Sequence, residues 1–235
     1  SGNSAQEFLQ RMTINDVRKL QIGDAQYSAM CYPDGGLVDD LILFRKSDGY
    51  FIVVNASNIQ KDFEWLNQYI SDDLCLGNVS ENYSLIALQG PKSREILSKF
   101  TDVNLKMPFY SYMDGIVCNN SVMVSRTGYT GELGYEIIGS HSSIKKAWSL
   151  LLNHKVDPCG LGVRDILRIE MKYCLYGNDL IDSINPIQSG LNWVVDLSKR
   201  NFIGKGAIEF EVNNPKKRLI CFRMLDRAIP RSHYK

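Results

Sequence analysis

Two adjacent aspartates interrupt an apolar stretch of the chain at 37–44, which reads LVDDLILF. Side chains alternate between the two faces of a strand, so Asp39 and Asp40 of such a strand point to opposite, otherwise apolar faces. A carboxylate buried alone is unfavourable, and each must therefore find hydrogen-bond donors or line a cavity. The pattern leaves two interpretations open: acids satisfied by backbone N–H groups near a turn, or an acid that serves a site.

A second acid follows the glycine-rich segment 125–134, which reads SRTGYTGELG. Its three glycines allow the backbone to approach a ligand or another segment closely. Glu136 comes next, between Tyr135 and Ile137, and a carboxylate there can accept two parallel N–H donors, such as those of an aminopyrimidine edge. The alternative is a tight turn that leads into an ordinary edge strand.

An arginine occupies the first turn of a predicted helix that begins after Gly160 and Gly162. The helix dipole favours acids at this end, so Arg164 lies against its electrostatic preference. This placement indicates an anionic or carbonyl ligand, or a buried ion pair with a partner such as Glu136.

The elements that must position these residues follow from periodicity and turn signals. We predict helices over 4–12, from about 57 to 70, and over 91–100, 142–153 and 161–172, and strands over 26–31, 37–44, 50–55, 83–88, 122–124 and 135–138. Neighbouring strands are joined locally, for example by the turn 33–36, before helices intervene. This order favours an α+β fold with antiparallel sheets over a doubly wound one.

Composition limits the function classes. The chain of 235 residues has 27 lysines and arginines against 26 acids, a net charge of +1, which gives no reason to expect a nucleic-acid partner. No apolar run approaches the ~20 residues of a membrane helix, and the first residues show no secretory signal. Six cysteines lack any C-x-x-C pair, which is typical of reduced thiols. We therefore expect no membrane association and a location in the cytoplasm or, in a eukaryote, the mitochondrial matrix.

Common catalytic motifs are missing from the sequence. It contains no phosphate-binding G-x-x-x-x-G-K-[ST] loop, no G-x-G-x-x-G, no G-x-S-x-G and no H-E-x-x-H, and its three histidines lie far apart. We therefore expect no metal site.

Seven segments taken together resemble one family, the T-proteins of the glycine cleavage system. In order they are 34–42 (DGGLVDDLI), 55–62 (NASNIQKD), 87–91 (ALQGP), 126–132 (RTGYTGE), 160–165 (GLGVRD), 175–179 (LYGND) and 202–205 (FIGK). The resemblance covers nearly the whole chain, and the family's chains extend further at both ends.

The resemblance implies a cloverleaf of antiparallel-sheet domains around a central folate site. It divides the chain into an α+β subdomain of 1–80 and 185–212, a folate-binding α+β subdomain of 81–184, and the start of a truncated C-terminal β-barrel at 213–235.

The same resemblance implies roles for individual residues. Asp40 matches the catalytic aspartate beside the reactive N5 of folate, and Glu136 matches the carboxylate that binds the pterin edge. Arg164 matches an arginine of the folate site, and Tyr27 and Tyr173 fall where tyrosines line the pocket.

The implied activity is that of an aminomethyltransferase. It transfers the methylene carbon of a lipoyl-bound aminomethyl group to the co-substrate tetrahydrofolate, with release of ammonia, and its partner is the lipoylated H-protein. One alternative is the folate-binding half of a dimethylglycine or sarcosine dehydrogenase. Another is a non-catalytic folate-binding protein of iron–sulfur cluster maintenance, whose K-G-C-Y-x-G-Q-E signature is absent near 201–205.

Overall fold

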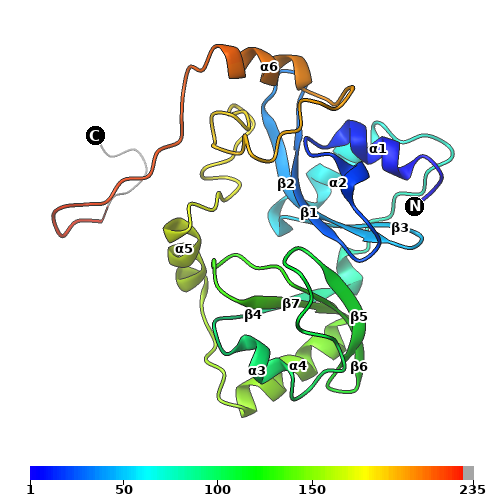
Figure 1. Ribbon diagram of the computed structural model, residues 1–235, viewed down its shortest axis with the longest axis vertical. Coiled ribbons are helices and arrows are strands. Elements are labelled where there is room, and N and C mark those ends of the chain that lie inside the picture. The colour runs from blue at the N-terminus through cyan, green and yellow to red at the C-terminus, as the bar shows by residue number, and fades with distance from the viewer. Residues whose placement is uncertain (230–235) are drawn as a thin grey trace.

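Two antiparallel sheets form the frame of the protein (Figure 1). The structure is a computed structural model, and it describes residues 1–229. The first sheet contains, in spatial order, β1 (Ala25–Cys31), β2 (Leu37–Lys46) and β3 (Gly49–Val54). The second contains β4 (Ser84–Gln89), β7 (Gly134–Gly139), β6 (Asn120–Ser125) and β5 (Tyr112–Val117).

The first sheet is covered by the helices α1 (Ala5–Met12) and α2 (Ile59–Asn67). Their apolar residues share one buried cluster with strand residues, and its members include Leu9, Met12, Met30, Leu43 and Leu66. The predicted β1–β2 turn forms because Gly35 adopts a left-handed φ of 89° and the Asp34 side chain accepts a 3.0 Å hydrogen bond from the Gly36 amide.

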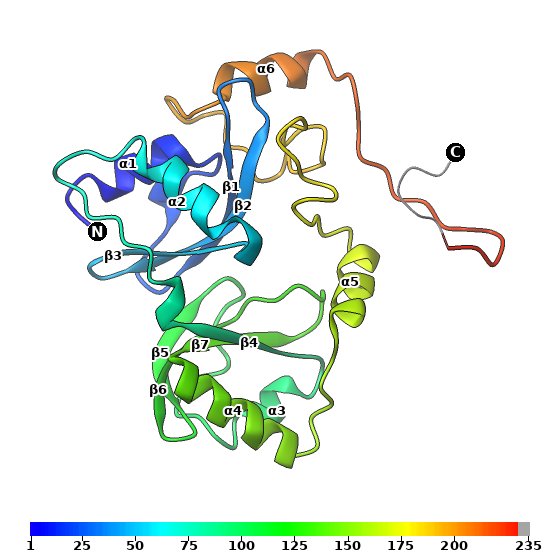
Figure 2. The same ribbon diagram turned by 180° about the vertical axis from the view of Figure 1, so that it is seen from behind.

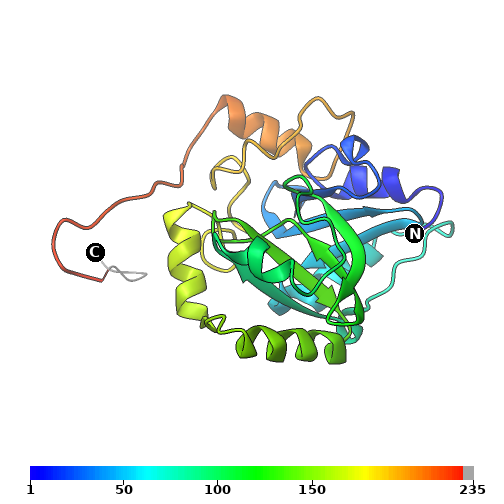
Figure 3. The ribbon, with the colours of Figure 1, turned by 60° about the horizontal axis from the view of Figure 1, so that its bottom comes forward.

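The second sheet packs against α3 (Ser93–Leu97) and α4 (His141–Asn153), which Figure 3 shows along its outer side. Ser140 caps α4, because its hydroxyl accepts a 3.2 Å hydrogen bond from the Ser143 amide. The core between sheet and helices contains Leu97, Val124, Ile137 and Ala147, all almost fully buried.

The two sheets are joined at the start of β1 and the end of β2. The amide of Ala25 donates a 2.8 Å hydrogen bond to the Tyr110 carbonyl, and the Tyr112 hydroxyl donates one of the same length to the Arg45 carbonyl. The rings of Phe44 and Tyr112 meet edge to face with centroids 5.5 Å apart. These contacts hold the β1–β2 hairpin beside the loops that flank β5 and β6.

After the second sheet the chain returns to the first one. Helix α5 (Leu161–Glu170) lies beside both sheets, and the following segment leads to α6 (Lys205–Asn213), as Figure 2 shows. Residues of this return, including Leu180, Leu191 and Phe202, share a buried cluster with Cys31 and Leu37 of the first hairpin. Residues 214–229 contain neither helix nor strand and lead away from α6.

The α+β class and the antiparallel sheets predicted from the sequence are confirmed. The prediction missed β5 and α6, and the helix predicted over 91–100 is shorter. Strand β5 contains Asp114 and Gly115, two residue types depleted in strands. Gly115 is required because a Cβ there would lie 2.4 Å from the Val103 side chain. The domain division stays a prediction, and the end of the predicted barrel segment 213–235 lies outside the described residues.

Candidate functional site

Asp40 lies on β2 with both carboxylate oxygens held. In the β1–β2 register Ala29 is opposite Asp40, which places Tyr27 diagonally across on the same face. The Tyr27 hydroxyl donates a 2.8 Å hydrogen bond to Asp40 Oδ2, and Asn55 Nδ2 donates a 2.7 Å bond to Oδ1. The carboxylate is therefore fixed in orientation by two side chains from the neighbouring strand and the end of β3.

Opposing effects act on the acidity of Asp40. Burial raises its pKa, the hydrogen bonds from Tyr27 and Asn55 lower it, and the nearby charge of Asp39 raises it, for a net upward shift. Burial and the Asp40 charge in turn raise the pKa of Tyr27 well above its ordinary value. Tyr27 therefore remains a donor over the physiological pH range.

Glu136 lies on β7 of the other sheet, opposite Ala87 on β4 and Ser125 on β6. The buried hydroxyl of Thr127 donates to Glu136 Oε2 and is itself 2.8 Å from the Ser125 hydroxyl. Burial raises the pKa of Glu136, while the Thr127 hydrogen bond and the charge of Arg164 lower it, and the net shift is upward. The carboxylate is thus sheltered from water and oriented by a hydroxyl pair.

The glycine-rich loop between β6 and β7 wraps around the Gln89 side chain. Gln89 Nε2 donates to the carbonyls of Thr127 and Tyr135 at 3.3 and 3.2 Å. A Cβ at Gly128 or Gly134 would lie about 2 Å from the Gln89 amide, so any larger residue at these two positions would displace that hydrogen-bonded amide. Close packing on Gln89 thus accounts for two of the three glycines of this segment.

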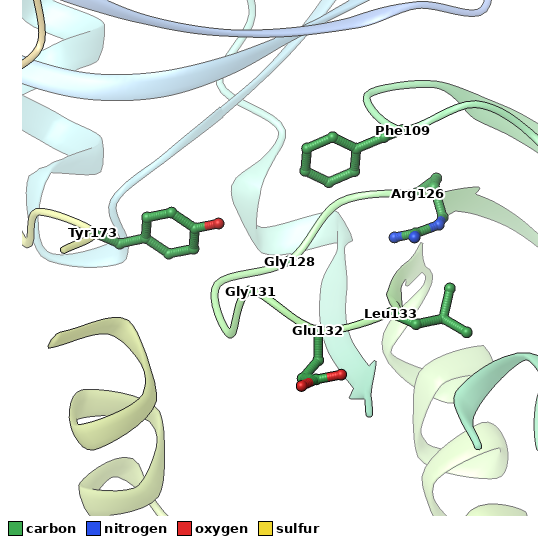
Figure 4. A pocket seen from close by; sticks show the side chains of 7 residues that line it. All are labelled: Phe109, Arg126, Gly128, Gly131, Glu132, Leu133 and Tyr173. Carbon is green, nitrogen blue, oxygen red and sulfur yellow. The ribbon is translucent and has the colours of Figure 1, made fainter. Parts of the chain in front are cut away.

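A cavity of about 240 Å³ opens between this loop and the segment after α5 (Figure 4). Tyr173 projects toward it from one side, and Phe109 and Arg126 lie on the other, with Glu132 at the loop. The predicted pocket residue Tyr173 therefore lines a cavity. Phe109, Arg126 and Glu132 were not among the predicted site residues.

Arg164 does not form the ion pair that was one of its two predicted alternatives. Its side chain is exposed in the first turn of α5, and its guanidinium lies 4.5 Å from the centroid of the Tyr129 ring. Tyr129 stacks on Tyr173 with centroids 5.7 Å apart. Among the described residues no ion pair joins Arg164 to Glu136, although its charge acts on that carboxyl. The cation–π contact holds Arg164 at the edge of the site, with its N–H groups exposed.

Tyr110 is a site residue that the sequence did not reveal. It has a left-handed φ of 59°, which is uncommon for a residue other than glycine. Its pKa is raised to about 12 by burial and then by Tyr173, Glu136 and Asp40. The charges of predicted residues from three parts of the chain thus act on Tyr110.

Arg168 was also missed, because one arginine in a helix gives no signal in a sequence. It is buried, donates a 2.8 Å hydrogen bond to Asp165 and a further bond to Asp179, and reaches the Tyr173 carbonyl at 3.3 Å. These bonds tie the end of α5 to the segment that carries Tyr173.

Residues 1–229 include no group of three or more histidine, cysteine or acidic side chains arranged to hold a metal ion. In the same part of the chain, no helix has the length and apolar character needed to cross a bilayer.

The comparisons with known proteins agree with this architecture. The family model described as "GCVT N-terminal domain" matches residues 1–199. The aminomethyltransferase of Chlorobaculum tepidum is 46% identical over 243 residues, which cover 100% of this chain and 67% of that protein. The chain belongs to the GCVT family, the T-proteins of the glycine cleavage system.

Other T-proteins agree with this assignment. The aminomethyltransferases of Chloroherpeton thalassium and Bacillus subtilis are 44% and 41% identical, and in each case the match covers all of this chain and 67% of the relative. The crystal structure of the glycine cleavage system aminomethyltransferase T from Bartonella henselae has a TM-score of 0.76 and 31% identity, and the match covers 91% of this chain and 59% of that one.

The T-protein family predicted from seven short segments is therefore confirmed, as is the aminomethyltransferase class of activity, and the two alternative classes are not favoured. T-proteins use tetrahydrofolate, so the co-substrate class agrees with the prediction. The roles of Asp40, Glu136, Arg164, Tyr27 and Tyr173 stay predictions.

Proposed function

We propose that this chain supplies the site at which an aminomethyl group, carried as a thioether on the lipoyl arm of an H-protein, is transferred to tetrahydrofolate. In the net reaction the carbon–sulfur bond and the carbon–nitrogen bond of the aminomethyl group break. Bonds from the same carbon to N5 and N10 of the folate form. The two protons displaced from N5 and N10 go to the lipoyl thiol and to ammonia. We further propose that the reaction takes place in the cytoplasm or the mitochondrial matrix.

The observation that carries the proposal is a sheltered carboxylate on each of the two sheets, both of which act electrostatically on Tyr110. Asp40 comes from β2 and Glu136 from β7, and both raise the pKa of the Tyr110 hydroxyl. A ligand that presents N–H donors and develops positive charge suits two acids at once. The pterin of tetrahydrofolate has both properties.

Each residue then has a distinct task. Within residues 1–229 the hydrogen bond to Glu136 uses Oε2, which leaves Oε1 to accept pterin N–H donors. Asp40, held by Tyr27 and Asn55, stabilises the positive charge that develops at N5 during the attack. Tyr173 lines the cavity, and Arg164 faces the carboxylate tail of the folate. The folate supplies the nucleophile, so positioning and charge placement are the main contributions of the protein.

Calorimetric titration with tetrahydrofolate tests the binding step. We expect saturable binding with a stoichiometry of one. The absence of heat and of any change in intrinsic tyrosine and tryptophan fluorescence at millimolar tetrahydrofolate would contradict the proposal.

A further inference from the structure

A second carboxylate pair lies behind Asp40, and the reaction proposed above does not use it. Asp39 is fully buried on the opposite face of β2. Its Oδ1 accepts a 2.8 Å hydrogen bond from Asn55 Nδ2, the same amide nitrogen that donates to Asp40. No N–H or hydroxyl donor of residues 1–229 reaches its other oxygen, Oδ2.

The partner of Asp39 is Asp62 on α2, only 1% exposed. Neither oxygen of Asp62 meets an N–H or hydroxyl donor in the described part of the chain, and the neighbouring carboxyl group of Asp39 raises its pKa. Two ionised carboxylates are acceptors only, and burying both with three oxygens that have no donor among residues 1–229 would be strongly unfavourable. One of the two must therefore carry a proton.

The surroundings assign that proton to Asp62. Asp39 already accepts a hydrogen bond from Asn55, whereas neither oxygen of Asp62 has a donor in the described part of the chain. Burial and the neighbouring carboxyl group of Asp39 together raise the pKa of Asp62 to about 9.

The other titratable groups nearby do not reverse this. The ammonium of Lys61 lowers the pKa of Asp62, but it is engaged with the Val38 carbonyl at 2.6 Å and lies 4.0 Å from the Tyr176 ring centroid. Asp40 adds a further negative charge, which favours the neutral acid. The charges of the two aspartates also act on Tyr176, whose hydroxyl donates to the Leu37 carbonyl, and the charge of Asp62 acts on Tyr32. The pKa of each tyrosine is raised, so both stay neutral.

We propose that Asp62 is a neutral carboxylic acid that donates its proton to a hydrogen bond with Asp39 and, through Asp39 and Asn55, positions Asp40. The two hydrogens of the Asn55 amide go to Asp39 Oδ1 and Asp40 Oδ1. A shift of Asp39 therefore moves Asn55 and with it Asp40. Asp62 is a positioning residue in this scheme, and its effect on turnover rests on the function proposed above.

Infrared difference spectroscopy of the full chain tests the protonation state without any substrate. At pH 7 we expect a carbonyl-stretch band of a protonated carboxylic acid that disappears in Asp62→Asn. The matched control is Glu64→Gln, an exposed acid on the same helix, which should leave the band unchanged. A wild-type spectrum without such a band, or a band that persists in Asp62→Asn, would overturn the inference.

Kinetics with tetrahydrofolate and aminomethylated H-protein test the positioning. An amide at position 62 can still donate to Asp39, whereas leucine of similar size cannot. Asp62→Leu should lower kcat by about 10- to 100-fold with little change in KM. Asp62→Asn should retain most of the wild-type kcat. Equal rates in the two variants would refute the positioning role. Failure of the proposed function would instead leave the wild-type chain inactive with its infrared band intact.

Discussion

The phenol of Tyr27 donates a 2.8 Å hydrogen bond to Asp40 Oδ2 from the same face of the β1–β2 hairpin. Tyr27 also stacks on Trp193, with ring centroids 5.9 Å apart, so its orientation is fixed independently of Asp40. The tyrosine thus lowers the pKa of Asp40 against the upward effect of burial. This relationship makes the pH dependence of the site a test of its geometry.

Tyr27→Phe keeps the stacked ring and removes the donor. Without that hydrogen bond the pKa of Asp40 rises further, so the carboxylate is protonated at a higher pH. The acidic limb of the kcat profile should therefore move to higher pH, while the surface control Tyr83→Phe leaves it in place. An acidic limb that is unchanged or moves to lower pH in Tyr27→Phe would show that this hydrogen bond does not lower the pKa of Asp40.

Glu136→Gln should fold normally and bind tetrahydrofolate about 10- to 100-fold more weakly. The change keeps the size of the side chain but replaces a charged acceptor, which contributes about 1.5–3 kcal/mol in such hydrogen bonds. Calorimetry measures the affinity, with the exposed Glu95→Gln as the control. Unchanged affinity in the folded variant would remove Glu136 from the site.

Thr127 acts on Glu136 through a single hydroxyl. Two conservative substitutions, one that removes this hydroxyl and one that keeps it, should therefore differ in their effect on tetrahydrofolate binding. Thr127→Val loses the donor to Glu136 Oε2 and should weaken tetrahydrofolate binding, whereas Thr127→Ser keeps the donor and should bind nearly as the wild type does. The same titration decides the point. If the two variants bound equally well, orientation by Thr127 would be unnecessary.

Part of this site was predictable because its chemistry lies in local patterns. The alternation around Asp39 and Asp40 and the glycine spacing before Glu136 are visible in short windows of sequence. Tyr110 and Arg168 were not predictable in this way, since their importance arises from partners distant in the chain or from an unusual φ. For Arg164, the sequence left a ligand and an ion pair open as alternatives. The structure shows a contact with the Tyr129 ring, and the role of Arg164 in binding stays a prediction.

The elements of the fold likewise differ in whether local sequence patterns predict them. Strands β1, β2 and β3 follow from runs of apolar residues that a clear turn separates. Strand β5 was missed because its glycine is dictated by the close approach of Val103, a tertiary contact. The pairing of Asp39 with Asp62 was also invisible, because it joins a strand to a helix that packs on it.

The stability of the protein should depend on pH through Asp62. Its folded-state pKa of about 9 lies above its ordinary value of 3.8, so the folded state binds the proton more tightly. This contribution to stability is complete below pH ~4 and is lost as the pH rises to about 9. Asp62→Asn removes this pH-dependent contribution. The free energy of unfolding of the variant minus that of wild type should therefore increase with pH across that window, by at most about 1.4 kcal/mol per pH unit.

Urea unfolding of wild type and Asp62→Asn at several pH values measures this difference. Glu64→Gln again serves as the control, because an exposed acid on α2 should give a flat difference. A difference that fell with rising pH would indicate that Asp62 is ionised in the folded protein.

Release of ammonia from aminomethylated H-protein in the presence of tetrahydrofolate tests the central claim most directly. The wild-type chain should release ammonia in a strictly folate-dependent manner. Asp40→Asn should fold and bind tetrahydrofolate, but its rate should be lower by about 10²-fold or more, the usual effect of removing one preorganised charged group. Near-normal turnover in Asp40→Asn, or no folate-dependent ammonia from the folded wild-type chain, would contradict the account.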